Sequence, residues 1–85
     1  LSPALKKVYY YMQGKKDIAD NLQDPEKAWV SSETLREVLD GGDGPRRVRQ
    51  LRDEHGIRLD VVTEKRSGKR LMAYYRFLDQ IPQAK

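Results

Sequence analysis

The stretch Gly44-Pro45-Arg46-Arg47-Val48-Arg49-Gln50-Leu51-Arg52-Asp53-Glu54-His55-Gly56 carries the start and stop signals of one short helix. Pro45 suits the first turn of a helix, because its missing N–H would have no hydrogen-bond partner there. Gly56 suits the end, because glycine readily adopts the left-handed conformation that closes a helix. The residues that recur at three- and four-residue spacing, and should face a core, are Val48, Leu51 and His55. The stretch therefore predicts a helix over about residues 45–55.

Four polar side chains of this helix cannot join the buried stripe and should mostly face outward. They are Arg46, Arg47, Arg49 and Gln50. A guanidinium fork matches the O6 and N7 atoms of guanine, and a side-chain amide matches N6 and N7 of adenine. The N-terminal half of the helix therefore suits the DNA major groove. A solvated, charge-rich surface helix is the alternative interpretation of the same residues.

The chain before residue 44 has two further helical patterns. Ser2 and Pro3 open the first, over about residues 3–13, and Gly14 is the expected stop. Its buried face is Leu5, Val8, Tyr9 and Met12. A polar loop is expected over residues 15–27, followed by a short edge strand over residues 28–30 in which Trp29 is a core anchor. Ser31 or Ser32 then caps a helix over about residues 32–39, which the glycine-rich residues 40–44 end.

After Gly56 the apolar residues alternate, which predicts a β-hairpin over about residues 57–78. The inward residues are Ile57, Leu59 and Val61 on one strand and Leu71, Ala73, Tyr75 and Phe77 on the other. The turn between the strands carries the cations Lys65, Arg66, Lys69 and Arg70. The element order predicts a single α+β domain over residues 1–85. This order of elements is typical of a winged helix-turn-helix, with three helices, a small antiparallel sheet and the C-terminal hairpin as the wing.

The composition and charge of the chain exclude some classes of function and favour others. The 85 residues contain no cysteine, which excludes disulfides and thiolate metal sites and is compatible with a cytoplasmic protein. No apolar run approaches the roughly 20 residues of a membrane span, and no signal peptide is apparent. The chain begins at Leu1 rather than Met, which favours a domain of a longer protein. The net charge is −2 over residues 1–44 and +6 over residues 45–85, which indicates a polyanionic partner for the second half.

Signals for catalysis are weak. His55 is the only histidine and has no evident partner for acid–base work. Asp60, Glu64 and Lys65 resemble nuclease carboxylate–lysine sets, but Arg66 stands where the spacing requires a lysine. We therefore expect no catalytic residue, no metal and no cofactor, and we expect that the isolated chain is not an enzyme.

The segment from Arg46 to Ile57 resembles the helix of winged-helix domains that accompany restriction endonucleases, including those of HNH type. That pattern has paired arginines, an aliphatic residue, Arg, Glu or Gln, Leu, Arg, two acids and a glycine before a strand. The resemblance covers residues 30 to about 77 and departs at Ile57, where tryptophan is common, and in the residues 15–27. It implies a DNA-reading module, with any nuclease domain elsewhere in a parent protein.

The sequence thus predicts a domain that binds double-stranded DNA, as the reading module of a restriction-type endonuclease. The expected DNA contacts are Arg46, Arg47, Arg49, Gln50, Lys65, Arg66, Lys69 and Arg70. No membrane partner is expected, and a homodimer is left open. One alternative is a transcriptional regulator that uses the same surface. Another is a winged helix for protein interaction, in which an apolar surface does the binding.

Overall fold

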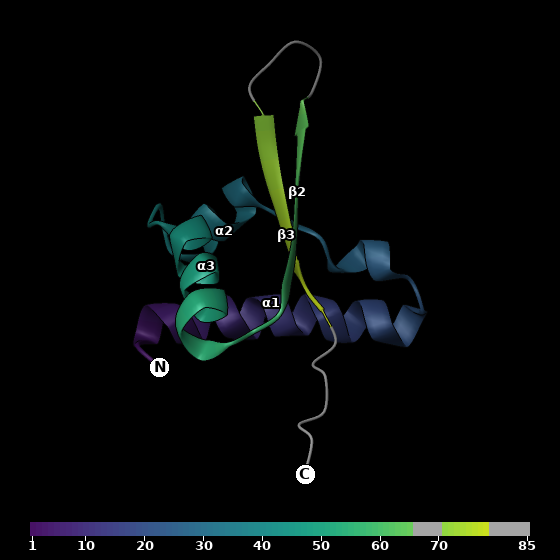
Figure 1. The fold of residues 1–85 in the computed structure, drawn as a ribbon, viewed down its shortest axis with the longest axis horizontal. Helices are drawn as coiled ribbons and strands as arrows, with labels where there is room; N and C mark the ends of the chain where they lie inside the picture. Colours follow the sequence, from purple (N-terminus) through teal and green to yellow (C-terminus); the bar gives the residue numbers. More distant parts are fainter. Residues whose placement is uncertain (66–70, 79–85) are drawn as a thin grey trace.

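A computed structural model of the protein describes residues 1–65 and 71–78 (Figure 1). Its elements in chain order are α1 (Pro3–Leu22), a short 3-10 helix η1 (Pro25–Ala28), β1 (Val30–Ser31), α2 (Ser32–Val38), α3 (Gly44–His55), β2 (Leu59–Lys65) and β3 (Leu71–Phe77). Within the described residues the fold is α+β, with three α-helices and one antiparallel sheet of three strands. The predicted helices near residues 32–39 and 45–55 and both hairpin strands are confirmed.

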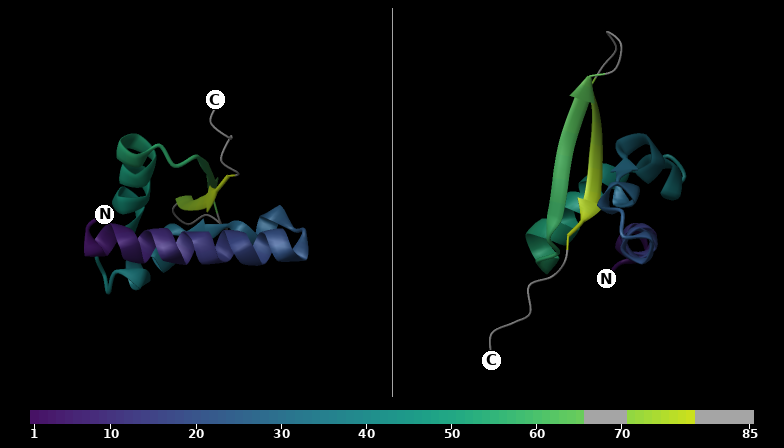
Figure 2. Two further views of the ribbon diagram at one scale, coloured as in Figure 1. Left: turned by 90° about the horizontal axis from the view of Figure 1, so that it is seen from below. Right: turned by 90° about the vertical axis from the view of Figure 1, so that its right-hand side faces the viewer.

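The sheet has the strand order β1-β3-β2, so the central strand is the last one along the chain. Val30 of β1 pairs with Tyr75 of β3, which pairs on its other side with Val61 of β2. Tyr75 and Phe77 are buried on the face of the sheet that packs on the helices. Figure 2 shows the sheet standing across α1, with α3 beside it over the N-terminal half of α1.

One hydrophobic core joins the three helices and the sheet. Its buried members are Leu5, Val8, Met12, Val30, Leu35, Val48, Leu51, Tyr75 and Phe77. Tyr9 packs against this core, with its ring centroid 5.7 Å from that of Phe77. Because α1 supplies three of the buried residues, its position fixes both the sheet and α3.

The first helix is longer than its sequence pattern predicts. The expected stop at Gly14 and the expected loop over residues 15–27 are wrong, since α1 continues to Leu22 and η1 follows. The continuation buries Ala19 and forms two contacts at four-residue spacing, Gln13 to Asp17 at 2.9 Å and Lys16 to Asp20 at 2.6 Å. The helix ends at Gln23, which adopts a left-handed φ of 54°.

Gly14 therefore lies in the middle of a helix, where glycine is unfavourable. A Cβ built there meets nothing within 4 Å, and its φ is not left-handed. We expect Gly14→Ala to raise the free energy of unfolding by about 0.5–1 kcal/mol, because alanine loses less backbone entropy on folding. Urea unfolding followed by circular dichroism measures this difference. A lower stability in the alanine variant would contradict this placement of Gly14.

Two residues predicted to face the core are exposed. His55 is the last residue of α3, lies beyond the buried Leu51 and is exposed. Val61 is 41% exposed although it shares a row with the buried Tyr75. The reason is its place on β2, the outer strand of the sheet, which the hairpin carries away from the helices (Figure 1).

Candidate nucleic-acid interface

The start of α3 is fixed by its contact with α2. The Asp43 side chain caps the helix by accepting the N–H of Arg46 at 3.3 Å, and Pro45 occupies the first turn. Gly44 is buried against α2, where an added Cβ would lie 2.2 Å from the carbonyl oxygen of Leu35. The absence of a side chain at Gly44 thus allows the two helices to meet at the beginning of α3.

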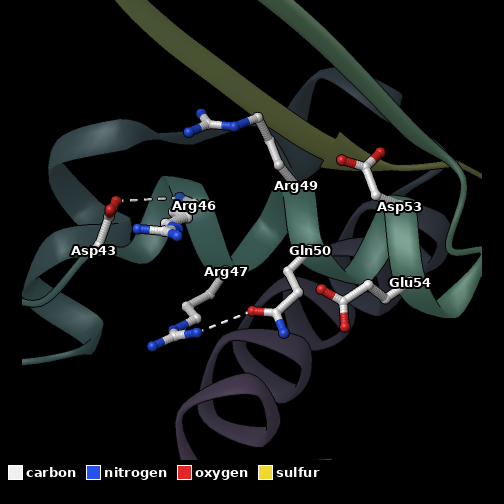
Figure 3. Close-up of a pocket in the computed structure, with 7 residues that line it drawn as sticks. All are labelled: Asp43, Arg46, Arg47, Arg49, Gln50, Asp53 and Glu54. Carbon is white, nitrogen blue, oxygen red and sulfur yellow. Dashed lines mark hydrogen bonds between the residues drawn. The ribbon is translucent and has the colours of Figure 1, made fainter.

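The opposite side of α3 is an open surface. Figure 3 shows the side chains that line an open hollow of about 620 Å³ along it. They are Asp43, Arg46, Arg47, Arg49, Gln50, Asp53 and Glu54. All four helix residues predicted to contact DNA are among them, so the structure brings these four together on one face. The buried side of the same helix carries Val48 and Leu51, which are 0% exposed.

Within this face, two of the polar side chains form a pair. Arg47 Nη1 donates a hydrogen bond to Gln50 Oε1 at 2.9 Å, which links successive turns of α3. Arg46 and Arg49 are exposed, and Figure 3 shows their side chains leaving the helix separately from the Arg47–Gln50 pair. The first two turns of α3 therefore present three guanidinium groups and one side-chain amide across the exposed width of the helix.

The last turn of α3 has acidic side chains on the same face. Arg52 Nε donates to Asp53 Oδ1 at 2.9 Å. This hydrogen bond lowers the pKa of the Asp53 carboxyl below its usual value and raises the pKa of Arg52. Asp53 and Glu54 thus limit the cationic surface to the N-terminal half of the helix. Their positions in the sequence already indicate this, because they follow Gln50 by three and four residues and so share its side of α3.

The second predicted set of contacts belongs to the turn of the hairpin. Arg66, Lys69 and Arg70, and the side chain of Lys65, lie outside the described residues. Figure 1 shows β2 and β3 projecting away from the three helices. The DNA contacts expected of these four cations therefore remain predictions from the sequence.

The predicted role of Trp29 as a core anchor is wrong. Its indole Nε1 donates to Glu26 Oε2 at 2.7 Å, and the Arg76 guanidinium lies 4.3 Å from its ring centroid. Arg76 also donates to Asp60 Oδ2 at 2.9 Å. Trp29, Arg76 and Asp60 thus meet Glu26 of η1 on the face of the sheet opposite to Tyr75 and Phe77. Strand alternation contained the signal, because the burial of Val30 places its neighbour Trp29 on the other face.

Among residues 1–65 and 71–78, no three His, Cys, Asp or Glu side chains are grouped so that they could hold a metal ion. None of the helices in the same ranges combines the length and apolar character that crossing a bilayer requires. His55, at the exposed end of α3, lines no part of the hollow in Figure 3.

Comparison of the chain with known proteins yielded no relative. No protein-family model, no curated protein and no solved structure matched it significantly. The case for a function therefore depends on the residues of α3 and the elements around it.

Proposed function

We propose that this chain is a winged-helix domain that binds duplex DNA with α3 in the major groove. The observation that carries the proposal is the face of α3 that bears Arg46, Arg47, Arg49 and Gln50, on a helix whose other side is anchored in the core. In this proposal α2 and α3 form the helix-turn-helix. The β2–β3 hairpin is the wing, and its turn cations contact the neighbouring backbone or minor groove.

The dimensions and chemistry of α3 support this placement. A helix with its side chains is about 10–12 Å across, which fits a major groove about 12 Å wide. Helices in this role contact base edges with their N-terminal residues, and in α3 that half carries the arginines. Asp53 and Glu54 at the other end repel phosphates and so favour an orientation in which the first turns lie deepest in the groove.

The resemblance of residues 46–57 to helices that accompany restriction endonucleases supports a narrower proposal. In it the domain is the DNA-reading module of a restriction-type enzyme whose catalytic domain lies elsewhere in the parent protein. A transcriptional regulator would use the same face of α3. The sequence of the parent gene beyond residues 1–85 separates these two, because only the first carries a nuclease motif there.

Fluorescence anisotropy with a mixed-sequence duplex tests DNA binding itself. We expect a dissociation constant in the micromolar range or below at about 50 mM salt, because arginines on α3 and cations of the hairpin turn displace counterions from phosphates. The logarithm of the binding constant should fall steeply with the logarithm of salt concentration, by about 0.9 for each phosphate contacted. The absence of binding at low salt, or binding that salt does not weaken, would refute the proposal.

A further inference from the structure

The face of the sheet opposite to Tyr75 and Phe77 contains a small open hollow, which we call the sheet hollow. Its volume is about 190 Å³, and the residues that line it are Glu26, Trp29, Val62, Glu64 and Tyr74. None of these five lines the hollow on α3. Two carboxylates, two aromatic rings and one aliphatic side chain thus surround a space that the proposed DNA contacts do not use.

The register of the strands explains why these side chains meet. Val62 of β2 pairs with Tyr74 of β3, so both side chains point to the same face of the sheet. Glu64 follows Val62 by two residues and shares that face. At the other side of the hollow, the indole Nε1 of Trp29 donates to Glu26 Oε2 at 2.7 Å. The sheet and one hydrogen bond therefore hold the walls of the hollow in place.

The protein already holds one guanidinium group beside this hollow. The Cζ atom of Arg76 lies 4.3 Å from the ring centroid of Trp29, and Arg76 Nη1 donates to Glu26 Oε2 at 3.3 Å. This geometry combines a cation–π contact with a charge-assisted hydrogen bond. The neighbourhood of Trp29 and Glu26 thus has the chemistry that a planar cation requires.

The two carboxylates of the hollow retain acceptor capacity. Both contacts of Glu26 use Oε2, and its side chain is 75% exposed. Glu64 is exposed, and its carboxylate forms no hydrogen bond or ion pair within residues 1–65 and 71–78. An ionised carboxylate accepts on both of its oxygens. Glu26 Oε1 and both oxygens of Glu64 are therefore available to a donor that enters the hollow.

The size of the hollow limits what can occupy it. Sites for drug-sized ligands have volumes of about 300–1,000 Å³, and the sheet hollow is smaller. The end of one long side chain fits such a space, with the rest of its molecule outside. Val62, which is 39% exposed, offers an apolar contact for methylene groups. A side chain with an apolar stem and a cationic tip therefore matches the hollow.

We propose that the sheet hollow binds an arginine side chain of a partner protein. Its guanidinium plane stacks against the aromatic rings, its N–H groups donate to Glu26 and Glu64, and its methylene groups contact Val62. Arginine fits better than lysine, because guanidinium is planar, is more weakly hydrated and has five donors that two carboxylates can share. The same carboxylates repel phosphates, so this surface and α3 serve partners of opposite charge.

An NMR titration of the protein without DNA tests the site. Trp29 is the only tryptophan, so its indole N–H gives a single resonance that reports on the hollow. With the peptide acetyl-Gly-Arg-Gly-amide we expect a saturable shift at low millimolar concentration, because one side chain makes few contacts. The lysine peptide should bind roughly threefold more weakly, and the neutral citrulline peptide should give no saturable shift.

Two of the possible results of this titration contradict the site directly. One is an arginine peptide that leaves the Trp29 resonance unshifted at about 20 mM. The other is a citrulline peptide that shifts it as strongly as the arginine peptide does. A lysine peptide that binds as tightly as arginine would show that the hollow does not recognise guanidinium.

A matched pair of variants locates the binding. Glu64→Gln removes one charge from the hollow with little change in shape, and should weaken the arginine peptide about two- to fivefold. Glu37→Gln makes the same charge change at an exposed position of α2, outside the hollow, and should leave the affinity unchanged. Equal losses in both variants would mean that the peptide responds only to net charge, and the proposed site would be wrong.

Guanidinium chloride distinguishes a protein side chain from a free small cation. The ion has the same charged group but lacks the methylene stem that contacts Val62, so it should bind about fivefold more weakly than the arginine peptide. If it shifted the Trp29 resonance as strongly at equal concentration, a partner protein would not be the source of the ligand. Since DNA is absent from every titration, failure here leaves the proposed function of α3 unaffected.

Discussion

Replacing Gly44 with alanine should lower the free energy of unfolding by about 2–4 kcal/mol, the largest stability loss that we expect from a single methyl group in this chain. The new Cβ would lie 2.2 Å from the carbonyl oxygen of Leu35, 2.4 Å from its carbonyl carbon and 2.7 Å from its Cβ. Two of these atoms are backbone, so no rotamer change relieves the clash. The beginning of α3 would have to move away from α2.

Urea unfolding and the melting temperature measure this loss. A change of 1 kcal/mol shifts the melting temperature of a domain of this size by about 4–8 °C, so the expected shift is large. Gly14→Ala is the matched control, since the same substitution in open space should stabilise the protein. Gly41→Ala lies between them, because Gly41 has a φ of +88° but no neighbour within 4 Å. Equal effects at the three glycines would contradict the close contact of α2 and α3.

Gly44 also illustrates how far the sequence predicts this fold. Pro45 and Gly56 mark the ends of α3 locally, because a proline ring and a left-handed φ act within a single residue. The burial of Gly44 is a tertiary effect, since it depends on how closely Leu35 approaches. A glycine within the glycine-rich residues 40–44 suggests only a turn. Nothing in the sequence indicates that Leu35 lies so close that only glycine fits at position 44.

The misplaced end of α1 has a related cause. Gly14 is a local stop signal that the surrounding residues override, through the burial of Ala19 and two side-chain contacts one turn apart. The propensity of one glycine, about 1 kcal/mol, is small against such packing. The size of Trp29 suggests a place in the core, whereas the pairing of Val30 with Tyr75 turns the indole towards Arg76 on the opposite face of the sheet.

The arginine face of α3 was predictable, because a 3.6-residue period separates Val48 and Leu51 from the charged side chains. The hydrogen bond between two side chains of this face is harder to predict from the sequence. The Arg47–Gln50 hydrogen bond follows from their three-residue spacing only when both side chains adopt suitable rotamers. The two therefore act as a unit, and this affects how their variants should behave on DNA.

Alanine at Arg47 or Arg49 should each weaken binding to the preferred duplex by about 1–3 kcal/mol, or roughly 5- to 150-fold, and reduce discrimination against other sequences. The reason is that a bidentate contact to guanine is lost while the phosphate contacts remain. Anisotropy titrations against the preferred site and a scrambled site measure both quantities. Arg52→Ala is the matched control, because Arg52 lies on the same helix but does not line the hollow, and it should change affinity less than twofold.

The Arg47–Gln50 pair allows a sharper test of how α3 contacts DNA. Because Arg47 Nη1 already holds Gln50 Oε1 in the free protein, removing either side chain releases the other from its contact. The losses from Arg47→Ala and Gln50→Ala should therefore be non-additive, with a coupling of about 0.5–3 kcal/mol, while Arg49→Ala should add independently to both. Lys69→Ala, in the turn of the hairpin, should instead weaken all sequences alike and reduce the salt slope by about one unit. If the α3 variants also lose affinity equally on every sequence, with strict additivity, the helix contacts only phosphates and the proposal of base reading by α3 is wrong.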